Sequence, residues 1–164
     1  MAGLGLSLDI KGAAELTKKL ASKTIKDPLQ EGIKKITQTL LGLVKKATVV
    51  DMGELRSGIT HKIEPFVGRV GTNVKYASFV EKGTRPHFPP VEPIEEWAQR
   101  HGMKGAGFAI ARAISKRGTQ AAHMMGGRRV KGEGMFAYGL EKLKDKLPNL
   151  LKGIGKDIKT EFDK

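Results

Sequence analysis

The sequence predicts an α+β fold, in which a small antiparallel sheet is packed by helices and a long helix closes the chain. Short stretches with an apolar residue at every second position predict strands near the N-terminus and in the middle of the chain. Longer stretches with apolar residues three and four positions apart predict amphipathic helices. A length of 164 residues suits one domain with its own core, so we expect residues 1–164 to form a single domain.

The first fifty residues are predicted to form a strand and two helices. Leucines that alternate with small or polar residues predict a strand over Leu4–Ile10. Ala13–Ser22 fits a short helix. Asp27 is an N-cap residue type and is followed by Pro28, which suits the first helical position. We therefore expect a longer helix to begin there and to end near Ala47.

A β-hairpin is predicted in the middle of the chain. Ile59–Glu64 and Val67–Thr72 read as its two strands. Pro65 lies between them and belongs in the turn, because proline cannot donate a hydrogen bond to a neighbouring strand. Just before the hairpin, the carboxylate of Asp51 is expected to cap a short turn over Gly53–Ser57.

The stretch that follows, from Val70 to Pro90, has the character of a surface that fits another protein. Its aromatic residues are spaced as in a single helical turn, and Gly83 then provides a typical helix end. Proline-containing pairs beyond the glycine favour an extended arm. We predict a protein interface in this stretch, formed by Tyr76, Phe79, Arg85, Pro86, His87 and Phe88.

The second half of the chain is predicted to be mostly helical. Two short helices are expected at Ile94–His101 and Phe108–Lys116. The long terminal helix follows from apolar residues at three- and four-residue steps between Leu140 and Phe162. Pro148 lies inside it, so a kink or a break is expected there.

Two glycine-containing segments in this half need separate interpretation. The dipeptide Gly83-Thr84 recurs as Gly118-Thr119, and coincidence between two helix ends is favoured over an internal repeat.

Gly126–Gly134 is basic and has few apolar residues, so it is predicted to be a flexible loop. Its cations either contact DNA or an acidic partner, or simply keep the loop soluble, and both interpretations stay open. These cations are Arg128, Arg129 and Lys131.

Composition points toward binding and away from catalysis. Cysteine is absent, and the 4 histidines are scattered without the spacing of a metal site. No glycine-rich segment has the pattern of a phosphate-binding loop, so we expect no catalytic residues, no cofactor and no metal. Apolar runs are far shorter than the roughly 18 residues that span a membrane. The net charge of +13 predicts attraction to anionic partners.

Three blocks of sequence resemble a known family. V-G-T-N-V-K-Y-A-S-F-V-E-K-G-T-R-P begins at Val70, and V-D-M-G-E-L-R-S-G-I begins at Val50. A third block comprises P-I-E-E-W-A-Q-R from Pro93 and F-A-I-A-R-A-I-S-K-R-G-T from Phe108. The blocks resemble small neck and tail-completion proteins of long-tailed bacteriophages, the lambdoid gene-product-ten-like tail components. The minor tail protein Z of phage lambda is related to that family.

The resemblance implies a structural virion protein rather than an enzyme. It implies a neck or tail-completion subunit that joins the head connector to the tail in a six-fold ring. Expected partners are further copies of the chain, a head-side connector or stopper, a tail terminator or tube protein, and the DNA in the channel. Assembly would take place in the host bacterial cytoplasm. The alternative from the residues themselves is a basic protein that binds nucleic acid without sequence preference.

Overall fold

The computed structural model describes residues 4–9, 23–125 and 128–162, and its fold is α+β, as predicted. The predicted helix at residues 13–22 lies outside these ranges. In chain order the elements are β1 (Leu4–Asp9), α2 (Lys23–Ala47), α3 (Glu54–Ser57), β2 (Ile59–Glu64), β3 (Val67–Thr72), α4 (Ala77–Lys82), β4 (Gly83–Thr84), α5 (Val91–Arg100), α6 (Gly107–Arg117), β5 (Thr119–Gln120), β6 (Ala122–Met125), β7 (Arg128–Lys131) and α7 (Met135–Phe162).

The main sheet has the strand order β1-β3-β2, and both pairings are antiparallel. The β2–β3 hairpin runs from the pair Ile59–Thr72 to the pair Glu64–Val67, which confirms the predicted strands and turn. Phe66 in that turn has a φ of 64°, and its amide donates to Gln30 Oε1 at 3.1 Å. This hydrogen bond ties the tip of the hairpin to α2.

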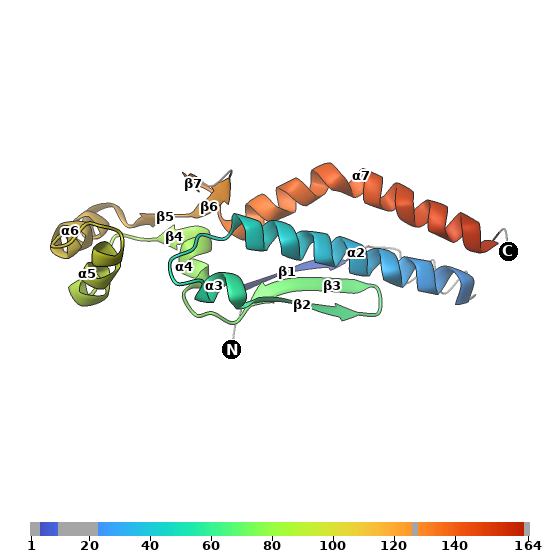
Figure 1. The fold of residues 1–164 in the computed structure, drawn as a ribbon, viewed down its shortest axis with the longest axis horizontal. Coiled ribbons are helices and arrows are strands. Elements are labelled where there is room, and N and C mark those ends of the chain that lie inside the picture. The colour runs from blue at the N-terminus through green and yellow to red at the C-terminus, as the bar shows by residue number, and fades with distance from the viewer. Residues whose placement is uncertain (1–3, 10–22, 126–127, 163–164) are drawn as a thin grey trace.

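Helix α2 lies between the sheet and α7, so the body of the molecule has three layers (Figure 1). The two helices are antiparallel, because the start of α2 meets the end of α7 at Gly32 and Ile154, and its end meets Gly139 near the start of α7. The core between the layers contains buried residues from α2, α3, β2, β3, α4 and α7. They include Ile36, Leu40, Val44, Leu55, Ile59, Val70, Ala77, Phe136 and Leu143.

The structure decides two predictions about prolines, of which the first needs correction. Helix α2 begins at Lys23 rather than at Asp27, and Pro28 lies inside it. Ile25 in the added turn is only 4% exposed, so burial of its side chain accounts for the extra turn. Pro148 does not break α7, which continues from Met135 to Phe162. The ribbon of α7 bends along its length, in keeping with the predicted kink (Figure 1).

Helices α5 and α6 pack against each other and project from one end of the body (Figure 1). We call this pair the α5–α6 lobe. The Glu95 carboxylate accepts hydrogen bonds from the amides of Gly105 at 2.6 Å and Gly107 at 2.7 Å. These bonds hold the pKa of Glu95 below its ordinary value and fix the loop that joins the two helices.

The segment predicted as a basic loop contains a strand. Arg128–Lys131 forms β7, which pairs with β6 from Ala122–Lys131 to Met125–Arg128. The prediction of an irregular backbone is therefore wrong for these residues, because hydrogen bonds to β6 substitute for the missing apolar contacts. The predicted flexibility of Gly126–Gly134 is a separate property and stays a prediction.

Candidate protein-interaction site

The aromatic turn predicted from the sequence is helix α4, which ends at Gly83 with a φ of 76°. Tyr76 precedes the helix and Phe79 lies within it, and their side chains are 41% and 59% exposed. The Tyr76 hydroxyl donates to Glu54 Oε2 at 3.1 Å. Partial burial and this carboxylate raise the pKa of Tyr76, which keeps the phenol neutral. The hydrogen bond to Glu54 holds the side chain in place.

The arm from Arg85 to Pro90 connects the body to the α5–α6 lobe, as Figure 1 shows between β4 and α5. His87 Nδ1 lies 2.9 Å from the Arg85 carbonyl oxygen. Phe88 is 57% exposed and meets the ring of Phe108 edge to face, with 6.1 Å between the ring centroids. The arm therefore presents apolar surface while one of its aromatic rings rests against α6.

A groove of about 770 Å³ opens between α4, the arm and the lobe. Four of the six predicted interface residues line it, namely Tyr76, Phe79, Arg85 and His87. Pro86 is exposed outside its lining, and Phe88 packs on the lobe instead. The structure thus brings most of the predicted residues to one apolar hollow, which we call the aromatic groove. Their role as an interface stays a prediction.

A two-stranded ladder closes the base of the lobe. Gly83 and Gly118 each end a helix with a positive φ, of 76° and 68°; β4 begins at Gly83 and pairs with β5, which begins just after Gly118. The Thr119 amide and hydroxyl each lie 3.1 Å from the Thr84 hydroxyl oxygen. The two Gly-Thr dipeptides of the sequence therefore belong to chain segments that lie side by side in the structure.

Asp51 does not cap the turn at Gly53–Ser57, because α3 has no side-chain cap. Its carboxylate instead accepts a hydrogen bond from Arg100 Nη2 at 2.8 Å and lies 3.9 Å from His101 Nε2. The hydrogen bond from Arg100 holds the pKa of Asp51 below its ordinary value. We call this contact the Asp51 latch, because it joins the loop before α3 to the end of α5.

Glu81 is a second anchor that sequence reasoning missed. Its carboxylate accepts hydrogen bonds from the amides of Phe136 at 2.9 Å and Ala137 at 3.0 Å, at the start of α7. A carboxylate at a helix N-terminus satisfies free amides and complements the helix dipole. Helix α4, which carries the exposed aromatic residues, is thereby fixed to the body.

The predicted basic residues are placed on β7. The backbones of Arg128 and Arg129 are paired with β6, whereas Lys131 extends an exposed side chain into a cavity beside the lobe. Within the described ranges, no group of three or more His, Asp or Glu residues is placed to hold a metal ion. None of the helices described here combines the length and apolar character that crossing a membrane requires.

Comparison with protein families finds a match for the first half of the chain. Residues 10–83 match the model of a family described as "Bacteriophage HK97-gp10, putative tail-component". The matched segment, which is less than half of the chain, therefore resembles bacteriophage tail components. More particularly, the matched segment is HK97-gp10-like, which confirms the family resemblance of the blocks that begin at Val50 and Val70. The match ends at Gly83, before the arm and the lobe.

Comparison with curated proteins and with solved structures gives no match.

Proposed function

We propose that the protein is a neck or tail-completion subunit of a long-tailed bacteriophage and that it joins the head-side connector to the tail. The family match over residues 10–83 carries this proposal. The aromatic groove supports it, because large apolar side chains at the surface are typical of protein–protein contacts. The partners would be a head-side connector or stopper and a tail terminator or tube protein.

The subunits are proposed to form a six-fold ring. In such a ring, one surface of each subunit docks on a different surface of the next, and the rotation closes the assembly. The aromatic groove is one of these surfaces. Its residues suit docking, because aromatic and proline residues lose little conformational entropy when they are buried. The Glu81 anchor and the hydrogen bond of Tyr76 hold the groove in shape before a neighbour arrives.

The proposal is tested by mass spectrometry of purified particles of the phage that encodes the chain. We expect peptides of this protein in particles that have been separated from the host lysate, at a constant ratio to the major tail protein. Presence in the lysate but absence from intact particles would contradict the proposal. Assembly in the bacterial cytoplasm is part of the same proposal, and the subunit would then be found in tails before they join heads.

One observation favours a second candidate function. The net charge of +13 suits a protein that binds nucleic acid without sequence preference. A neck subunit could also use this charge toward DNA in the channel, so the two functions share one property. They differ in where the protein is found, since a nucleic-acid-binding protein that acts in the cell need not enter particles.

A further inference from the structure

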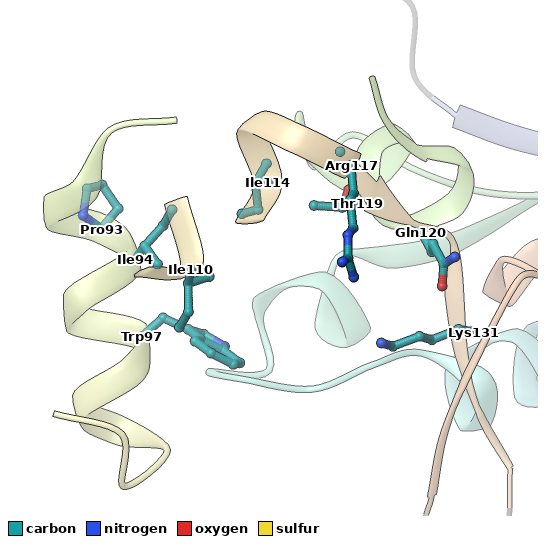
Figure 2. Close-up of a pocket in the computed structure, with 10 residues that line it drawn as sticks. Pro93, Ile94, Trp97, Ile110, Ile114, Arg117, Thr119, Gln120 and Lys131 are labelled. Atoms are coloured by element: carbon teal, nitrogen blue, oxygen red, sulfur yellow. The ribbon is translucent and has the colours of Figure 1, made fainter. Parts of the chain in front are cut away.

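A second cavity, of about 640 Å³, lies beside the aromatic groove and shares Ile94, Ile114, Thr119 and Gln120 with its lining (Figure 2). One wall is apolar and comes from the lobe, where Ile94, Trp97, Ile110 and Ile114 line it. Arg117 at the end of α6 and Lys131 on β7 extend side chains into the same space. We call it the Arg117–Lys131 pocket.

Among the described residues, the two cations of this pocket have no anionic partner. Neither forms a salt bridge within the described part of the chain, where other charged residues such as Arg100 and Lys35 do. The lining contains no aspartate or glutamate. A guanidinium and an ammonium that share a partly apolar hollow favour a carboxylate or phosphate over neutral groups.

The apolar wall distinguishes between possible occupants. Single-stranded nucleic acid prefers open aromatic faces for stacking. Here the wall is mainly isoleucine, and the Trp97 ring is already stacked on His101 with centroids 4.3 Å apart. Isoleucine surface beside two cations instead complements a carboxylate that is next to an apolar side chain. A second copy of the chain is a poorer fit, because each copy carries a net charge of +13.

We propose that the Arg117–Lys131 pocket docks an acidic segment of a different protein. Carboxylates of the segment lie at Arg117 and Lys131, and a neighbouring apolar side chain packs on Ile110 and Ile114. The assignment does not depend on the ring, because Arg117 and Lys131 line this pocket and not the aromatic groove, although Ile114 lines both. The proposal also gives Lys131 a role that Arg128 and Arg129 do not share, although the three cations are neighbours in the sequence.

Trp97 gives a direct assay, because it is the only tryptophan of the 164-residue chain and lines the pocket. The probe is an acetylated Glu-Leu-Asp-Phe-Glu peptide, titrated into the full chain while Trp97 emission is recorded. We expect a saturable change. Arg117→Glu and Lys131→Glu should each weaken binding by about tenfold, as loss of a charge-assisted contact predicts. Lys116→Glu, on the same helix but outside the lining, is the matched control and should bind nearly as wild type.

Three results would overturn the proposal. The first is equal binding by the Arg117→Glu, Lys131→Glu and Lys116→Glu variants, which would mean that the peptide responds only to net charge. The second is undiminished binding of a peptide with glutamine and asparagine in place of its acids. The third is tighter binding of a short oligothymidylate that is lost in the same two variants, which would assign the pocket to nucleic acid.

Discussion

At the residue scale, Gly68 on β3 is the described glycine at which an added Cβ would overlap a neighbour most, and that neighbour is Thr37 on α2. Thr37 is only 1% exposed, and its hydroxyl donates to the Ile33 carbonyl at 2.7 Å. A Cβ added at Gly68 would overlap the Thr37 hydroxyl oxygen. The helix can lie this close to the sheet only because residue 68 has no side chain.

Gly68→Ala is therefore expected to destabilise the protein by about 1–3 kcal/mol, the usual effect of overpacking. Thr37→Ala should recover part of that loss when the two changes are combined, because the overlapping atom is gone. Gly42→Ala is the control, since nothing lies near its added Cβ, and it should be neutral or stabilising by up to about 1 kcal/mol. Urea unfolding of wild type, the three single variants and the double variant measures these effects, and strict additivity of the Gly68 and Thr37 changes would contradict the proposed contact.

The sequence allowed the buried core positions to be predicted, but not the side-chain contacts between distant segments. Periodic apolar positions such as Leu40 and Leu143 could be assigned to the core, because a helix places them on one face. Asp51 could not be paired with Arg100, because 49 positions separate them and local rules offered only a cap. The Glu81 anchor was missed for the same reason, since α7 begins more than fifty positions later.

At the element scale, the α5–α6 lobe is attached by few connections. The β4–β5 ladder contains two residue pairs, and the Asp51 latch joins the end of α5 to the body. Local propensity predicted both helices of the lobe, and the two strands of the ladder were too short to be recognised from sequence. The position of the lobe therefore had to come from the structure.

Acid is expected to loosen the lobe. The pKa values of Asp51 and Glu95 are lowered in the folded protein, so their contribution is fully present above their unfolded pKa values, about 3.9 and 4.3. It is lost as the pH falls through the lower folded values. Trp97 emission should therefore differ between wild type and Asp51→Asn at neutral pH, and the difference should vanish only once the pH falls below the lowered folded pKa of Asp51. A difference that persists in acid would argue against the latch.

The segment Gly126–Gly134 should exchange its amides quickly in the isolated protein. Five glycines and three cations provide little apolar surface to offset the ordering entropy, which is about 1–2 kcal/mol per residue for the backbone. Hydrogen exchange should show little protection there and strong protection over Leu140–Leu147, where Leu143 is buried. Strong protection of the whole segment would mean that the β6–β7 hairpin is a stable part of the fold.

At the scale of the whole molecule, the fold class and the family resemblance could both be reached from the sequence, because the blocks around Asp51 and Tyr76 are contiguous. The aromatic groove could be predicted only in part. Tyr76, Phe79, Arg85 and His87 come from one stretch, whereas Ile94 and Ile114 on the opposite wall come from the lobe. The Arg117–Lys131 pocket combines distant segments, and of its two cations only Lys131 was singled out from the sequence.

The net charge of +13 predicts weak binding to DNA of any sequence. Binding should fall steeply as salt rises, because association releases counterions from the phosphates. Filter binding of duplexes with unrelated sequences, at a low and a physiological salt concentration, measures this directly. Tight binding to one sequence at physiological salt would instead favour a dedicated nucleic-acid-binding function.

The central claim is that the subunit docks in the particle through its exposed aromatic residues, and the most direct test is incorporation of a variant. Phe79→Ser combined with Phe88→Ser should stay folded, because both side chains are more than half exposed, at 59% and 57%. Leu151→Ser, which changes an exposed leucine on α7 that is 45% exposed, is the matched control. In a phage that lacks the native gene, the account predicts control protein in purified particles and little or none of the folded double variant. Equal incorporation of the two would contradict the account.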